Sequence, residues 1–178
     1  NWSAYSELPM TALFPIPDLS AYDPTTREAA TDLIERFQAL DTGTAELSAV
    51  HARKEACRIA RDLSQESSEL VLPVVPQLVN LLHQELDRSF DGTAAEMVQH
   101  NPSASIQTYA TQVLTACAER SLVQTYAQGT CRIDRFLTAL AQTLCHAQSY
   151  AARLHSLRGL ASICVFVPER LVDCTSTV

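Results

Sequence analysis

The same apolar spacing occurs in two widely separated segments of this chain, residues 75–86 and 133–144. In both, hydrophobic residues follow one another at intervals of 3, 1, 3 and 4 positions. This spacing lines one stripe of an α-helix. Because one helix cannot bury such a stripe by itself, the pattern predicts helices stacked side by side. The stripes are Val75, Leu78, Val79, Leu82 and Leu86, and Ile133, Phe136, Leu137, Leu140 and Leu144.

The sequence predicts an all-α fold of about six main helices, arranged as stacked helical hairpins in an α-solenoid. Asp23 before Pro24 is typical of a helix start, and Pro73 and Pro76 suit the first turn of a later helix. In the last helix, Leu154, Leu157, Ala161 and Cys164 form the expected packing stripe. The helices are expected at about residues 25–40, 45–65, 73–90, 105–119, 131–146 and 150–164.

Prolines suggest three parts of the chain. Residues 1–24 hold four of the eight prolines and are expected to form an extended strap or linker, because proline at this density excludes a helix interior. The apolar residues of this part either dock along the helices, engage a partner or belong to a disordered linker. Residues 25–167 are expected to form the helical-repeat domain, and residues 168–178 a C-terminal turn and tail.

Composition argues against several function classes. The four glycines are too few for a glycine-rich phosphate loop. Residues 1–103 carry 16 acidic and seven basic side chains, and residues 104–178 carry four and six. No cluster of Lys and Arg suits a nucleic acid backbone. No apolar run approaches the roughly 20 residues that span a bilayer, so a membrane partner is not expected either.

Six cysteines contain no C-x-x-C spacing, which argues against a zinc or redox motif. Buried free thiols in a cytoplasmic protein are favoured over a disulfide framework. The pair Cys145-His146 is expected to be a buried thiol beside a surface imidazole. No catalytic, cofactor or metal site is expected. Glu66 and Glu69 are predicted to lie in a solvated turn, and Glu85 and Asp87 to face water.

Two stretches resemble a HEAT or armadillo unit: residues 53–60, which read RKEACRIA, and residues 72–82, which read LPVVPQLVNLL. The order of elements between Asp32 and Gln148 resembles the divergent, TOG-like domain near the C-terminus of the microtubule-polymerase family. Tubulin-binding members of that family carry a tryptophan and basic residues in the turns between helices. Here the clearest turn reads QESSE at residues 65–69, and the only tryptophan is Trp2. The resemblance therefore implies a microtubule-associated adaptor domain that does not hold tubulin itself.

From this architecture we expect a non-catalytic scaffold or adaptor that binds another protein in the cytoplasm, with the cytoskeleton as one setting. The alternatives are an accessory or regulatory subunit of an enzyme complex, and a helical bundle with a ligand pocket or a reactive thiol. Partner contacts are expected in the loop at 91–103 and at two sets of side chains. These are Gln65, Glu66 and Glu69 on a turn, and Arg132, Arg135, Arg153 and Arg158 on a basic face.

Overall fold

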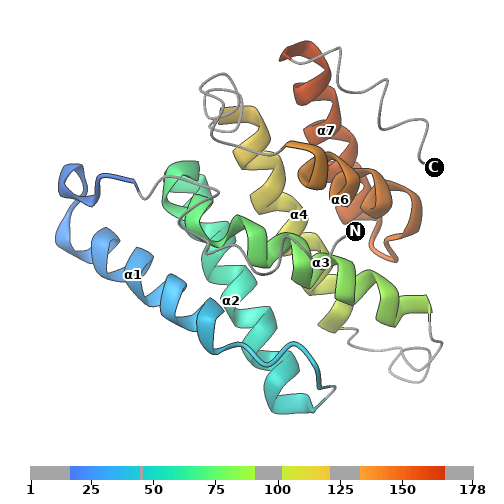
Figure 1. Cartoon of the computed structure of the whole chain (residues 1–178), viewed down its shortest axis with the longest axis horizontal. Coiled ribbons are helices and arrows are strands. Elements are labelled where there is room, and N and C mark those ends of the chain that lie inside the picture. Colours follow the sequence, from blue (N-terminus) through green and yellow to red (C-terminus); the bar gives the residue numbers. More distant parts are fainter. Residues whose placement is uncertain (1–16, 45, 91–101, 121–132, 167–178) are drawn as a thin grey trace.

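The computed structural model describes residues 17–44, 46–90, 102–120 and 133–166 (Figure 1). This part of the chain forms six α-helices and two 3₁₀-helices and contains no strand. The predicted all-α fold is confirmed. The elements are η3 (Leu19–Ala21), α1 (Pro24–Ala39), α2 (Leu47–Glu66), η4 (Ser68–Val74), α3 (Val75–Phe90), α4 (Pro102–Arg120), α6 (Ile133–His146) and α7 (Tyr150–Phe166).

The helices lie in two layers. α2, α4 and α7 are neighbours in that order, with α4 in the middle (Figure 1). α3 and α6 contact each other and lie in front of this row, where α3 packs on α4 and α6 on α7. α1 packs on α2 at the opposite end from α7. The row therefore has α1 at one end and α7 at the other.

Local sequence signals set several helix ends. The Asp23 carboxylate accepts a hydrogen bond from the Thr26 backbone N–H at 3.0 Å and caps α1, with Pro24 as the first helical residue. This confirms the predicted start of the first helix. Pro102, the first residue of α4, extends that helix beyond its predicted start because proline has no N–H to pair in a first helical turn.

The segment after α2 differs from the expected turn. Gln65 and Glu66 belong to the last turn of α2, and a 3₁₀-helix follows at once. Its residues Leu70, Val71 and Val74 are at most 1% exposed. The segment is a packed part of the core, while the polar side chains of Gln65, Glu66 and Glu69 are exposed.

The end of the proline-rich region contacts the helical domain. Leu19 and Tyr22 pack against the core as partly buried residues. The Tyr22 hydroxyl lies 2.9 Å from the Ser67 hydroxyl at the end of α2. Of the three alternatives for the strap, docking applies to residues 17–23. Residues 1–16 of the strap, and residues 168–178 of the expected tail, lie outside the described part.

The stripe of α3 packs inward as predicted, and all five of its residues are buried. In α6, Phe136, Leu137 and Leu140 are buried and Leu144 is half-buried, while the Ile133 side chain is outside the described set. These two helices supply much of the core between the layers. The stripe of α7, in contrast, faces solvent.

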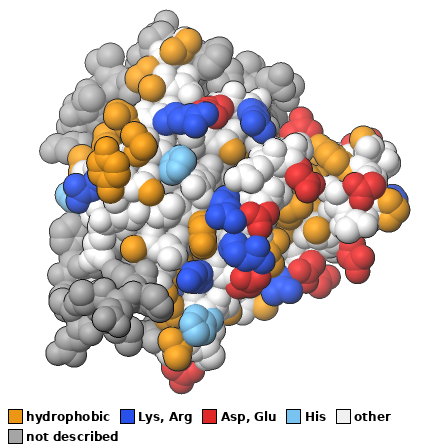
Figure 2. All heavy atoms as spheres, turned by 180° about the vertical axis from the view of Figure 1, so that it is seen from behind, with side chains coloured by type: hydrophobic (Ala, Val, Ile, Leu, Met, Phe, Trp, Pro, Cys, Tyr) orange, Lys and Arg blue, Asp and Glu red, His pale blue; other side chains and the backbone are white. Residues whose placement is uncertain are grey.

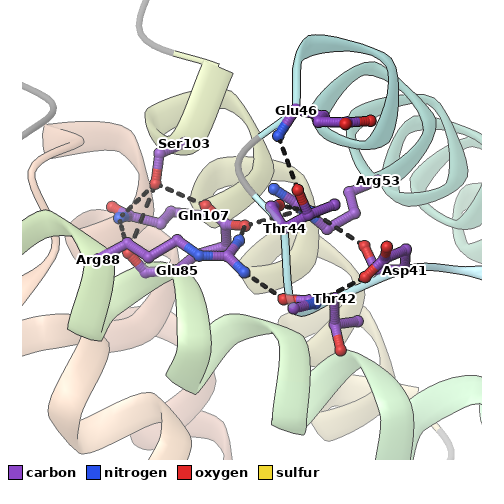
Figure 3. Close-up of polar contacts among 10 residues, drawn as sticks. Asp41, Thr42, Thr44, Glu46, Arg53, Glu85, Arg88, Ser103 and Gln107 are labelled. Atoms are coloured by element: carbon purple, nitrogen blue, oxygen red, sulfur yellow. Dashed lines mark hydrogen bonds and ion pairs between the residues drawn. The ribbon is translucent and has the colours of Figure 1, made fainter.

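A buried ion pair joins α2 to α3. Nε of Arg53 lies 3.2 Å from Oε1 of Glu85, and the two side chains are 1% and 3% exposed. The prediction that Glu85 faces water is therefore wrong, while Asp87 is exposed as expected. Arg53 Nη1 donates to the backbone oxygens of Asp41 and Thr44, at 2.9 and 2.8 Å, which ties the α1–α2 loop to the pair (Figure 3).

Further groups surround the Glu85 carboxylate. Arg88, one turn later in α3, donates to Oε1 of Glu85 at 2.7 Å and to the backbone oxygen of Thr42. The Ser103 hydroxyl of α4 donates to Oε2 of Glu85 at 2.8 Å (Figure 3). Gln107 Nε2 donates to the Glu85 backbone oxygen at 3.3 Å. The carboxylate thus has partners on both oxygens, as a buried charge requires.

We expect Glu85→Gln to lower the free energy of unfolding by about 3–5 kcal/mol, because Arg53 would remain buried without a counter-charge. Burial already lowers the pKa of Arg53 below its ordinary value, and the negative charge of Glu85 opposes this shift. Chemical denaturation measures the change.

A matched control is Asp32→Asn in the exposed pair Arg36–Asp32, whose side chains are about half exposed. This change is expected to cost about 0–1 kcal/mol. The double variant Arg53→Met/Glu85→Leu is expected to cost less than Glu85→Gln alone, because no unpaired charge remains buried. Equal effects of Glu85→Gln and Asp32→Asn would contradict the role assigned to the pair.

Gly159 lets α7 approach both α4 and α6 closely. A Cβ built at this glycine would lie 3.1 Å from a methyl group of Leu140 and 3.1 Å from the Thr115 hydroxyl. That hydroxyl donates to the backbone oxygen of His155 at 2.7 Å and joins α4 to α7. A larger residue would have to move one of these neighbours.

Gly159→Val is therefore expected to destabilise the fold by about 1–3 kcal/mol through overpacking. Thermal unfolding followed by circular dichroism would show the loss. Gly43→Ala is the control, since Gly43 is exposed and a Cβ there meets only the Asp41 carboxylate at an ordinary 3.6 Å. A Gly159→Val melting temperature equal to that of the control would contradict the close approach.

Candidate protein-interaction surface

α7 exposes the apolar stripe that was expected to pack inward. Leu154 and Leu157 are each 53% exposed, Tyr150 is 80% exposed and Val165 74% exposed. Ala161 and Cys164 are exposed as well. The prediction that this stripe is buried is wrong. Figure 2 shows a group of hydrophobic side chains at the upper left, the side on which α7 lies in this view from behind.

The opposite face of α7 makes the packing contacts. Ala152, Ser156, Gly159 and Ile163 are buried against α4 and α6. These residues are also spaced by 4, 3 and 4 positions, so α7 has two parallel stripes on opposite sides. Three of the four buried residues are small, and small residues permit the close approach seen at Gly159. The larger hydrophobic residues consequently face solvent.

Two predicted site residues, Arg153 and Arg158, flank the exposed stripe and are both exposed. Arg158 pairs with Glu119 of α4 through Nε and Oε1, and its side chain remains 66% exposed. Arg153 Nε donates to the backbone oxygen of Ala147 at 2.6 Å. α7 itself contains no Asp or Glu. The surface of α7 therefore combines apolar side chains with positive charge.

The other two arginines of the predicted basic face are not placed. Arg132 lies outside the described residues, and the Arg135 side chain, on α6, does so too. Of that face, only the Arg153 and Arg158 side chains are described, and they lie on opposite edges of the α7 stripe.

The predicted polar ridge of Gln65, Glu66 and Glu69 is exposed at the end of α2. Arg120 Nη1, at the end of α4, donates to the Gln65 backbone oxygen at 3.4 Å. The neighbouring residue Glu119 pairs with Arg158. The C-terminal end of α4 therefore separates the ridge from the α7 surface, and the two predicted sets do not form one site.

The arginines of α2 have partners within the chain. Arg58 binds the carboxylates of Glu55 and Asp62 at 2.6 and 2.8 Å. Arg61 also contacts Asp62, and its guanidinium lies 4.7 Å from the centre of the Tyr109 ring on α4. Glu55 raises the pKa of Arg58, and Arg58 in turn lowers that of Glu55. The charges in this area are paired with one another, so it is less suited to an anionic partner than the surface of α7.

His155 lies behind the apolar stripe, between α7 and α4. Burial lowers its pKa below the ordinary value, and the nearby Arg158 lowers it further. The imidazole is therefore kept neutral at neutral pH, with one ring nitrogen 3.2 Å from the Gln112 side-chain nitrogen. Its role is to join the two helices and not to add charge to the surface.

Four of the six cysteines lie in the described segments, and they fall into two groups. Cys57 and Cys117 are buried free thiols, as predicted, and burial raises the pKa of Cys57. Cys145 and Cys164 are exposed. The expectation that Cys145 is buried beside a surface histidine is therefore wrong for the thiol, although His146 is exposed. Cys145 lies near the end of α6, while Cys164 lies on the apolar stripe of α7.

Comparisons with known proteins give no identification. No family model matches this chain, and it matches no curated protein and no solved structure. The HEAT, armadillo and TOG-like resemblances remain predictions. Within the described segments, no helix has the length and hydrophobicity that crossing a membrane requires. In the same segments, no group of three or more His, Cys, Asp or Glu residues is placed to hold a metal ion.

Thiol labelling tests the placement of the cysteines. We expect iodoacetamide to label Cys145 and Cys164 in the folded protein, and Cys57 and Cys117 only after unfolding, because buried thiols are inert. Peptide mass spectrometry identifies the labelled sites. Labelling of Cys57 at the rate of Cys145 would contradict the packing. A Cys145 rate far above that of Cys164, which is also exposed, would favour the reactive-thiol alternative.

Proposed function

We propose that this protein is a non-catalytic scaffold or adaptor, and that the outer face of α7 is its binding surface. The observation that carries this proposal is the exposure of four large hydrophobic side chains on one helix, Tyr150, Leu154, Leu157 and Val165. Contiguous exposed apolar patches commonly mark interaction sites. The stripe is held on a helix whose other face is anchored in the core, so binding would order little additional chain.

The two ends of the helical row differ in a way that supports this proposal. The exposed residues of α1 are mainly polar and include Thr25, Glu28 and Glu35. A polar outer face is what a terminal helix of a stacked array needs for solubility. α7 lacks such a face. The difference points to α7 as the end of the row at which another molecule binds.

Site-specific crosslinking tests the proposed surface. A photoreactive amino acid replaces Leu157 on α7 or Leu47 on α2, which is 62% exposed and serves as the matched control. In an extract from the organism of origin, we expect a discrete crosslinked protein only from position 157, and its loss with Leu154→Asp. Leu154 is half exposed, so this change should leave the melting temperature nearly unchanged. Equal crosslinking from both positions would refute the proposal.

A cytoskeletal setting is the finer part of the proposal, and its support is the resemblance of the order of elements between Asp32 and Gln148 to the TOG-like domain. The acidic ridge of Glu66 and Glu69 is unsuited to the acidic face of tubulin, so an adaptor is favoured over a tubulin-holding domain. Co-sedimentation tests this setting. We expect the protein to pellet with microtubules only when extract proteins are present. If the protein is absent from that pellet, the cytoskeletal setting is wrong, while the proposal that α7 binds a partner is unaffected.

A further inference from the structure

The exposed stripe of α7 has the spacing of a helix-pairing seam. Tyr150, Leu154, Leu157, Ala161 and Cys164 follow one another at intervals of 4, 3, 4 and 3 positions. Alternation of three and four residues is the pattern by which one helix packs lengthwise against another. A bound strand, or a single side chain inserted in a pocket, would not need apolar residues along more than four helical turns. The seam therefore suits another helix.

The place of α7 in the fold supports the same conclusion. α2, α4 and α7 pack in sequence, each helix against the next, and the stripe lies on the side of α7 away from α4. A helix laid on the stripe would take the position of the next member of this row. The new contact would resemble the packing between α4 and α7. α6 would still pack on α7 in the other layer.

Charge indicates what flanks the apolar residues of the incoming helix. In an α-helix with 3.6 residues per turn, Arg153 lies about 60° to one side of the stripe and Arg158 about 80° to the other. α7 has no acidic residue to balance them, although Arg158 contacts Glu119 of α4. Carboxylates on both edges of an incoming helix would meet these two guanidiniums.

A second copy of this chain is a poorer occupant. Pairing two α7 helices along their stripes would bring together four arginines with no acidic side chain from either helix. Like charges facing each other across a seam are unfavourable. The same argument excludes a basic amphipathic helix.

We propose that the outer face of α7 binds a single acidic amphipathic helix of a partner protein, with apolar residues on the stripe and carboxylates opposite Arg153 and Arg158. This inference rests on the proposed function and specifies its partner. Each half of the interaction has its own contribution. The stripe supplies apolar burial, and the arginines select the charge of the partner.

The test uses three fluorescent peptides of about three heptads, the length that pairs along a seam of this kind. The first has Leu at the seam and Glu at the flanking positions, the second has Lys in place of Glu, and the third keeps Glu but has Ser at the seam. Anisotropy measures the binding of each peptide to the 178-residue chain. We expect the acidic Leu peptide to bind at least about tenfold more tightly than either control, a difference of about 1.4 kcal/mol.

Variants of the protein separate the two contributions. Leu157→Asp is expected to weaken the acidic Leu peptide at least about tenfold, whereas Leu47→Asp on α2 should have no effect. The double variant Arg153→Glu/Arg158→Glu should reverse the preference so that the Lys peptide binds best. Arg27→Glu/Arg36→Glu, two exposed changes on α1, is the control for net charge and should leave the preference unchanged. Melting temperatures verify that each variant is folded.

Several outcomes would overturn this inference. Equal binding of the acidic and basic Leu peptides would remove the role of the arginines, and an unreversed preference in Arg153→Glu/Arg158→Glu would do the same. Sedimentation equilibrium showing a dimer that Leu157→Asp dissociates would assign the stripe to a second copy. If position 157 crosslinks to a natural partner but the acidic peptide does not bind, the proposed function stands and this inference fails.

Discussion

The buried ion pair between Arg53 and Glu85 constrains how α2, α3 and α4 meet. Two charges in the core are costly unless each is fully paired, and here the partners come from α2, α3, α4 and the α1–α2 loop. Hydrophobic contacts along helices tolerate sliding and rotation. The directional hydrogen bonds of this network do not, so they fix how α3 is turned relative to α2 and α4. The network thereby holds α3 against α2, α4 and the α1–α2 loop.

Apolar periodicity was sufficient to predict the helices and the inward face of α3. It was insufficient for Glu85, because this residue follows Leu82 by three positions and precedes Leu86 by one, on the apolar side of α3. A carboxylate at such a position is normally read as a residue at the edge of the buried face. Its counter-charge is 32 positions away at Arg53, and a single sequence contains no signal for that pairing. The sequence shows that Ser103 and Gln107 can form hydrogen bonds, but it does not show that they bind Glu85.

Only part of the candidate site was predicted, and the reason is related. Periodicity identifies stripes, but it does not say which of two opposite stripes faces the core. On α7 the more hydrophobic stripe was taken as the inner one. The fold instead buries Ala152, Ser156, Gly159 and Ile163, because small side chains allow α7 to lie close to α4 and α6. Arg153 and Arg158 were recognised correctly as exposed, while the apolar residues between them were missed.

The polar network also bears on whether the chain can be divided. Repeat architectures often tolerate the removal of terminal units, since each unit contacts only its neighbours. Here Gln107 binds the Glu85 backbone through its nitrogen and accepts from the Gln148 backbone N–H through its oxygen, at 3.2 Å. One amide side chain thus connects α3, α4 and the loop between α6 and α7. A shortened protein ending before α4 would lose the Ser103 and Gln107 partners of Glu85, so this buried network ties α4 to the helices that precede it.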